Sequence, residues 1–247
     1  MKQNLFVRKG MTILSKGIGY SAVVMLLLSA CSKENVSKGN SDANVQESNA
    51  IPGHNFSELK STGTDHGFFW QCYVSSGSGS ISFPSAGTYA GNFAVSWSNI
   101  GDIVAGKGWN PGSNRTVNYN CGALSGQFKN FGVYGWTTSP LIEYYVTEMG
   151  SVASGSVINT ISSDGHNYNF YKHQQVNQPS IQGTATFWQY LDNWGGSSVG
   201  SSHAVTMGNH INNWKSRGGA GFGNFNLQIL AVEDWGGGSG YCNATVW

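Results

Sequence analysis

The sequence carries little charge. Asp, Glu, Lys and Arg make up 10% of its 247 residues, where about a quarter is usual in soluble domains. From position 61 onward it has six basic and eight acidic side chains, a formal charge of −2, and the basic ones form no cluster. Proteins that bind nucleic acids gather Lys and Arg on one surface to neutralise phosphates, so a nucleic-acid partner is not expected.

Metal-ligand patterns and long apolar runs are also scarce. The four cysteines show no Cys-x-x-Cys spacing and the six histidines are scattered, so neither a metal site nor a cofactor is predicted. The apolar run at 22–28 is too short to cross a bilayer, which takes about 20 residues. This run belongs to a targeting signal and is left out of the fold.

The N-terminal segment resembles a bacterial lipoprotein signal. Four basic residues precede the apolar run, and Leu-Ser-Ala-Cys at 28–31 follows it. This pattern predicts a signal peptide over 1–30 and a lipid on Cys31, which would anchor the exported protein to a membrane or the cell surface. Ordinary secretion and a transmembrane anchor remain the alternatives, and Met11 is an alternative start to Met1.

The rest of the chain divides into a tether and one domain. Residues 31–61 are rich in Ser, Asn, Lys and Glu, which predicts a flexible tether because such a segment has little to bury. Residues 62–247 are enough for a single domain with its own core. The chain's 35 Gly, 9 Trp and 11 Tyr indicate many short strands with tight turns.

Short apolar runs broken by Gly, Asn, Ser and Pro mark the expected strands. They lie at 68–74, 93–97, 116–119, 132–136, 141–146, 167–171, 184–188, 226–232 and 244–247. Their spacing favours an all-β sandwich over a parallel α/β sheet. An apolar stripe at helical spacing, ended by two glycines, predicts one helix at about 208–217.

Glutamate is rare in the predicted domain. Glu143, Glu148 and Glu233 are its three examples, and Glu143 and Glu233 interrupt apolar, aromatic runs. A carboxylate on a half-buried strand is costly unless it is paired or used. Two of them on separate strands indicate a facing pair that divides acid and nucleophile roles at one bond, as in glycoside hydrolysis. Glu148 is expected to be a solvated side chain.

Several blocks of sequence together resemble a known family. They lie, in order, at 98–109, 133–146, 179–183, 209–216, 231–235 and 244–247, and the most specific is Pro-Leu-Ile-Glu-Tyr-Tyr at 140–145. From Gly67 to the C-terminus the chain resembles the glycoside hydrolase family 11 endo-β-1,4-xylanases. The resemblance implies an all-β jelly roll of two curved antiparallel sheets with one short helix, and a cleft across the concave sheet that binds xylan.

The resemblance also implies roles for individual residues. Glu143 matches the nucleophile and Glu233 the acid/base of a retaining enzyme that works through a glycosyl-enzyme. Substrate contacts are implied for the side chains that match the family's cleft, namely Tyr73, Tyr134, Tyr145, Pro179 and Gln189. Among these, Tyr134 and Tyr145 match tyrosines that hydrogen-bond the nucleophile, and residues 179–183 match the thumb, a hairpin loop that closes over substrate.

Asp102 matches a position beside the acid/base that is Asn or Asp in the family. An Asp there can share a proton with Glu233, which implies an acidic pH optimum. Four other positions depart from the family pattern: Tyr73 replaces Trp, Gln175 replaces Arg, Leu227 replaces Tyr, and Glu-Asp-Trp at 233–235 replaces Glu-Gly-Tyr. These changes concern affinity more than reaction type. Asp234 follows Glu233 on a strand and is expected to point away from it.

Two other functions and one pairing remain open on the sequence alone. A β-1,4-glucanase of the same fold is one alternative, and a non-catalytic polysaccharide-binding jelly roll is the other, although it would need no carboxylate pair. The three cysteines beyond the signal, Cys72, Cys121 and Cys242, allow one disulfide, and the sequence does not choose the pair. A monomer is expected.

Overall fold

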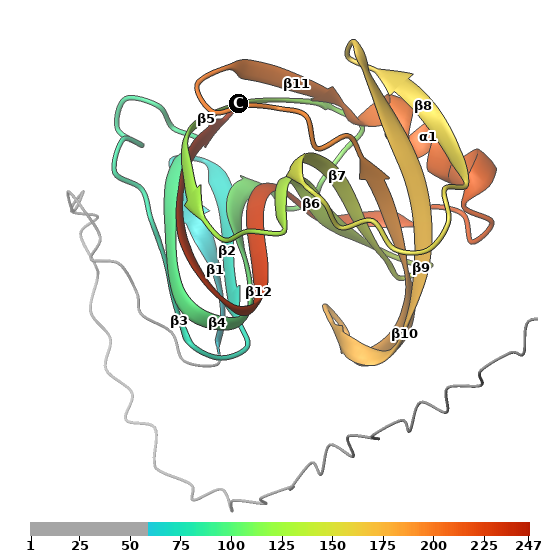
Figure 1. Ribbon diagram of the computed structural model, residues 1–247, viewed down its shortest axis with the longest axis horizontal. Coiled ribbons are helices and arrows are strands. Elements are labelled where there is room, and N and C mark those ends of the chain that lie inside the picture. The colour runs from blue at the N-terminus through green and yellow to red at the C-terminus, as the bar shows by residue number, and fades with distance from the viewer. Residues whose placement is uncertain (1–58) are drawn as a thin grey trace, which may run out of the picture. The chain divides into compact units, whose positions relative to one another are not determined.

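Two long strands, β4 (Asn92–Trp109) and β12 (Asn224–Val246), organise the computed structural model, which describes residues 59–247. They pair antiparallel with each other over most of their length. Between Trp235 and Gly240 the register shifts twice, and Gly236 and Gly237 take φ angles of 87° and 91°, which side chains disfavour. The pair bends, and its two halves belong to different layers (Figure 1).

The inner layer carries the concave face. Its strands follow the order β1-β2-β4-β12-β6-β7-β10-β9-β8. Besides β4 and β12 they are β1 (Leu59–Asp65), β2 (Phe68–Val74), β6 (Asn130–Thr138), β7 (Ile142–Gly150), β8 (Asn159–Ser163), β9 (His166–Ser180) and β10 (Gly183–Asn193). The all-β prediction is confirmed, with one difference: β7 and β10 pair in parallel, while the other pairs of this layer are antiparallel.

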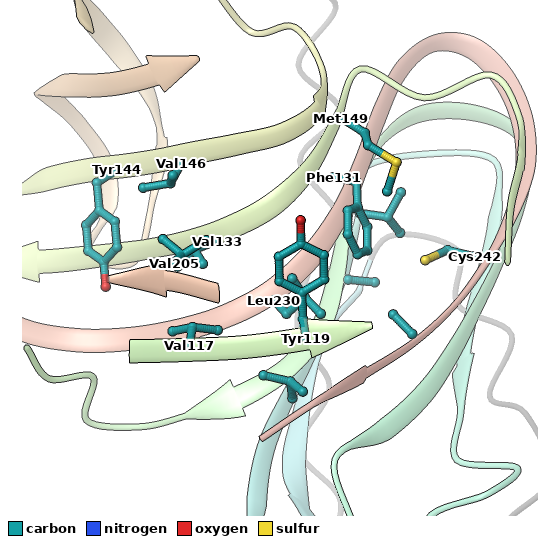
Figure 2. Close-up of a cluster of buried hydrophobic side chains, with 14 of the residues drawn as sticks. Val117, Tyr119, Phe131, Val133, Tyr144, Val146, Met149, Val205, Leu230 and Cys242 are labelled. Carbon is teal, nitrogen blue, oxygen red and sulfur yellow. The ribbon is translucent and has the colours of Figure 1, made fainter. Parts of the chain in front are cut away.

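The outer layer is smaller and covers the back of the inner one. Here β3 (Ser78–Ser82) pairs with the first half of β4, β5 (Thr116–Gly126) pairs with the end of β12, and β11 (Ser202–Thr206) pairs with β5. The main core fills the space between the layers, as Figure 2 shows. It includes Val117, Tyr119 and Val205 from the outer layer, and Phe131, Val133, Val146 and Leu230 from the inner layer.

The helix α1 (Met207–Arg217) confirms the helix predicted at 208–217. It buries Met207, Ile211 and Trp214, and the Nδ1 atom of its His210 lies 2.7 Å from Oδ2 of Asp192 on β10. This buried contact fixes the helix to the inner layer. Among the described residues no helix is long and apolar enough to cross a membrane.

The nine predicted strands all lie on observed strands, and the misses have a common cause. The runs at 226–232 and 244–247 prove to belong largely to one strand, β12. The strands β1, β3, β8 and β11 were not predicted, since their sequences are mostly Ser, Thr, Gly and other polar residues. The first described strand, β1, begins at Leu59, and the boundary at 62 stays a prediction. The predicted signal peptide, Cys31 and most of the tether lie outside the described residues.

The expectation that Glu148 is solvated is wrong. Its side chain is fully buried between the layers, where Tyr119 donates a hydrogen bond to Oε2 and Tyr168 donates one to Oε1, each at 2.7 Å. Burial raises the pKa of Glu148, and the two phenol donors oppose that shift. Glu148 therefore links β7 to β5 and β9 from within the core.

A second buried charge, Lys107 on β4, holds the edge of the inner layer. Its ammonium donates to the carboxylate of Asp65 on β1 and to the main-chain oxygens of Ala90 and Asn92. Burial lowers the pKa of Lys107, while Asp65 opposes the shift. The lysine thus joins β1 to the loop that precedes β4.

Replacing Asp65 with Ala is expected to lower the free energy of unfolding by about 3 kcal/mol, because it leaves the Lys107 ammonium buried without its counter-charge. Urea unfolding followed by tryptophan fluorescence measures the change. His66→Ala is the matched control, since His66 is exposed and also contacts Asp65. Equal stability of the two variants would contradict the role given to Asp65.

Candidate active site

A cleft of about 510 Å³ lies on the concave face of the inner layer. Side chains from β2, β4, β12, β6, β7 and β10 line it, and the hairpin that joins β9 to β10 curls back toward β12 (Figure 1). Pro179 and Ile181, at the tip of this hairpin, also line the cleft. The cleft therefore has a rigid floor and one wall formed by a projecting hairpin.

Glu143 of β7 lies on the cleft floor and is 8% exposed. Tyr134 donates to its Oε1 at 2.8 Å, and Gln189 donates from Nε2 to its Oε2 at 2.7 Å. Trp136 donates from Nε1 to the Tyr134 hydroxyl at 2.5 Å, which leaves the hydroxyl proton directed at Glu143. Both oxygens of this carboxylate are thus held by donors from neighbouring strands.

Glu233 of β12 faces the same cleft and is 6% exposed. Tyr145 donates to its Oε1 at 3.3 Å. The same phenol also lowers the pKa of Glu143, so the hydroxyl lies within reach of both carboxyl groups and can direct its one proton at either. The other oxygen of Glu233, Oε2, is buried with no hydrogen-bond partner among the described residues.

Tyr134 shares this face, which corrects one sequence-based assignment. Strand alternation correctly predicts that Glu143 and Tyr145 point the same way, but it also suggests that Tyr134 lies on another face. In the structure Tyr134 is directly opposite Tyr145 across β6 and β7, and their rings pack edge to face at 5.1 Å. Alternation gives the faces within a strand, whereas the pairing register decides which faces of two strands coincide.

The two carboxyl groups experience different fields. Burial raises the pKa of Glu143 to about 7, and hydrogen bonds from Gln189, Tyr134 and Tyr145 limit the rise. The pKa of Glu233 lies well above its usual range, first because of burial and then because of the negative charges of Asp102 and Glu143. Glu143 is thus the carboxyl that ionises more readily, and Glu233 the one that retains its proton.

Asp102 of β4 lies at the same end of the cleft as Glu233. Burial and then the charge of Asp234 raise the pKa of Asp102 to about 6, and its Oδ1 is buried with no hydrogen-bond partner within residues 59–247. Asp234 itself points away from the cleft, as expected, and accepts a hydrogen bond from Trp97 Nε1 at 2.9 Å on the core side. The cleft therefore holds three carboxyl groups, two of which have a buried, unpartnered oxygen.

The other predicted site residues separate into two groups. Tyr73, Pro179 and Gln189 all line the cleft, as does Gln175, which donates to Gln189 Oε1 at 3.1 Å. Leu227 does not, because it is buried within the cluster of side chains on the cleft face that includes Tyr134 and Trp136.

Trp235 lines the rim of the cleft and is 41% exposed. Lys129 lies 5.9 Å from the centre of its ring. Of the two residues that follow Glu233 and differ from the family pattern, Asp234 thus lies in the core and Trp235 lies at the cleft.

Several cleft residues were missed in the sequence. Gln71 and Trp136 each lie two positions from a predicted site tyrosine, Tyr73 and Tyr134, on the same strand. The period of two that puts alternate side chains on one face could have found both. Lys60 and residues 151–154 also line the cleft, but they carry no such signal. Within residues 59–247, no cluster of three or more His, Cys, Asp or Glu could hold a metal ion.

Comparison with known proteins gives consistent matches. The family model described as "Glycosyl hydrolases family 11" matches residues 65–245. "Ethylene-inducing xylanase" of Penicillium digitatum and "Endo-1,4-beta-xylanase 2" of Rhizopus oryzae are each 44% identical over 183 residues, covering 70% of this chain and 79% of the relative. "Bifunctional xylanase/xylan deacetylase" of Cellvibrio japonicus is 41% identical over 186 residues, covering 71% of this chain and 28% of that protein.

Replacing Gln189 with Leu is expected to raise the pKa of Glu143 by about one unit, because the lost hydrogen bond favours the ionised form. NMR titration of ¹³C-labelled glutamate carboxyls measures it. Gln178→Leu is the control, since Gln178 lines the same cleft but donates to the main-chain oxygen of Val176. A lower pKa of Glu143 in the Gln189 variant, or the same shift in both, would contradict the assignment.

Proposed function

Because the chain belongs to glycosyl hydrolase family 11, we propose that it is an endo-1,4-β-xylanase that cleaves internal β-1,4 bonds of xylan with retention of configuration. The observation that carries this proposal is the pair Glu143 and Glu233, two buried carboxyl groups in one cleft that share the Tyr145 hydroxyl. The unequal pKa shifts of the pair support a division into nucleophile and acid/base.

In the first step Glu143, as the carboxylate, attacks the anomeric carbon while Glu233 protonates the leaving oxygen. This double displacement needs the two carboxyl groups about 5–5.5 Å apart, and the Tyr145 hydroxyl, which acts on both, supports such a spacing. Tyr134 and Gln189 keep the carboxylate of Glu143 oriented through their hydrogen bonds. The raised pKa values of Tyr134 and Tyr145 keep both phenols protonated as donors.

In the second step water replaces Glu143 at the anomeric carbon. Once Glu143 is esterified its negative charge is gone, so the pKa of Glu233 falls and the ionised group can take a proton from the attacking water. The charge of Glu143 is among the causes that raise the pKa of Glu233 in the free protein. The same two side chains therefore serve both halves of the reaction.

Substrate binding is assigned to the uncharged groups that line the cleft. Tyr73 supplies an aromatic ring on β2 for stacking on a sugar, with less area than the Trp it replaces. Pro179, at the tip of the β9–β10 hairpin, would contact the bound xylan from above. Gln189, Tyr134 and Tyr145 line the cleft beside the two carboxyl groups and would contact the sugar whose bond is cleaved. Gln175, in the place of a family Arg, supports Gln189 through a neutral hydrogen bond.

The N-terminal sequence supports a proposal for where the enzyme is located. The Leu-Ser-Ala-Cys pattern at 28–31 supports export and a lipid on Cys31, with residues 31–61 as the tether and ordinary secretion as the alternative. A lipid there would hold a monomeric catalytic domain near the surface where polysaccharide arrives.

Replacing Glu143 or Glu233 with Gln is expected to reduce kcat on xylan at least about a hundredfold, since each removes an essential nucleophile or proton donor. Reducing-sugar release from xylan by the full chain measures the loss. Glu148→Gln makes the same chemical change on β7, but at a carboxyl sealed in the core. It is expected to stay within severalfold of the parent per folded molecule.

Parallel assays on carboxymethylcellulose separate the alternatives. Faster hydrolysis of the cellulose derivative than of xylan would replace the proposal with a β-1,4-glucanase. Binding of xylan without hydrolysis by the parent would replace it with a carbohydrate-binding module.

The pH profile is expected to peak on the acid side of neutrality. Activity rises as Glu143 ionises, about pH 7, and falls as Asp102 loses the proton it shares with Glu233, about pH 6. Because these pH ranges overlap, only a minority of molecules have Glu143 ionised while Asp102 and Glu233 keep their shared proton. The activity therefore peaks between the two pKa values. Asp102→Asn removes the lower of these two pKa values, so the loss of activity at high pH would then follow the deprotonation of Glu233. The optimum of kcat/KM should move upward, and an unmoved optimum would contradict the role of Asp102.

A further inference from the structure

All three described cysteines are free thiols in the structure, and two of them lie on adjacent strands. Cys121 on β5 and Cys242 on β12 belong to neighbouring antiparallel strands of the outer layer, and both are fully buried in the main core. Figure 2 shows Cys242 pointing into the cluster that contains Phe131 and Met149.

A bulge brings the two thiols together. Cys121 lies opposite Ala244, and Cys242 lies opposite Leu124, with the register shifting between them where Gly122 has no partner. The extra residue keeps both cysteine side chains on the core face of their strands. Their thiols are hydrogen-bonded to each other.

Cys72 stands apart from this pair. It lies on β2, opposite Ser61 and Ala105, and burial raises the pKa of its thiol to about 12. Its strand neighbours are β1 and β4, so no other cysteine of residues 59–247 lies opposite it.

We propose that Cys121 and Cys242 form a disulfide bond that joins β5 to the C-terminal half of β12 in the exported protein. Thiols in hydrogen-bond contact need to approach by only about 2 Å to reach the bond length of about 2.05 Å, which side-chain rotation at both residues supplies. The inference rests on these contacts and on export, and it is independent of the reaction assigned to the cleft.

The oxidant is a protein or small-molecule disulfide of the kind that supports folding outside the cytoplasm. The sulfur of Cys121 attacks one sulfur of that disulfide and releases the other as a thiolate. Cys242 then attacks the Cys121 sulfur of the mixed disulfide and releases the second thiolate. Two protons and two electrons leave the cysteines, and the oxidant is reduced to two thiols.

Burial decides when this bond forms and how long it persists. Both cysteines are inaccessible to solvent in the folded protein, so exchange takes place as β12 docks onto β5 during folding. Afterwards the same burial keeps reductants away. The bond is therefore structural: it closes a loop of about 120 residues and restricts the unfolded chain.

The first test counts thiols in the full chain carrying Cys31→Ser, produced in an oxidising bacterial periplasm. Titration of the denatured, unreduced protein is expected to find one free thiol per chain. Peptide mapping by mass spectrometry should recover a cross-linked pair that contains positions 121 and 242. Three free thiols, or a cross-link that contains Cys72, would overturn the proposal.

A second test measures stability in the same background. The parent is expected to lose about 10 °C in melting temperature after unfolding and refolding in dithiothreitol. The variant that also carries Cys242→Ser should melt near the reduced parent and show no response to the reductant. An unchanged melting temperature of the parent after reduction would overturn the proposal, and this comparison holds even if the variant does not fold.

Discussion

The antiparallel ladder between β4 and β12 runs through both layers and fixes where the remaining strands can pair. Its inner half carries Asp102 and Glu233 to the cleft, while its outer half carries Cys242 into the core. Since successive side chains of a strand point to opposite faces, a slip of one residue would exchange Glu233 with Asp234. One register therefore determines both which carboxyl faces the cleft and which one accepts the hydrogen bond of Trp97.

Glu143 and Glu148 show that burial and hydrogen bonds alone do not decide where a carboxyl is presented. Both lie on β7, both are buried, and both accept hydrogen bonds from tyrosine hydroxyls. They differ in the face of β7 on which they lie. Glu143 opens onto the cleft, whereas Glu148 is enclosed between two layers. Access to the cleft is what separates the two carboxyls.

The sequence allowed the all-β class, the helix and the two cleft glutamates to be predicted, because each leaves a local mark: a period of two or 3.6, or a charge within an apolar run. The sequence wrongly indicated a solvated Glu148, since its hydrogen-bond partners Tyr119 and Tyr168 are 29 and 20 residues away along the chain. Lys60 gains its place in the cleft only through the pairing of β1 with β2, where it lies opposite Tyr73. Contacts set by pairing between distant strands are what a single sequence conceals.

The length of β12 also orders events in time. Glu233 lies in β12, which follows the other described strands along the chain and whose residues 240–246 pair with both β4 and β5. Glu143, Tyr134 and Gln189 belong to strands that are synthesised earlier. The cleft therefore gains its second glutamate last, when β12 pairs between β4 and β6.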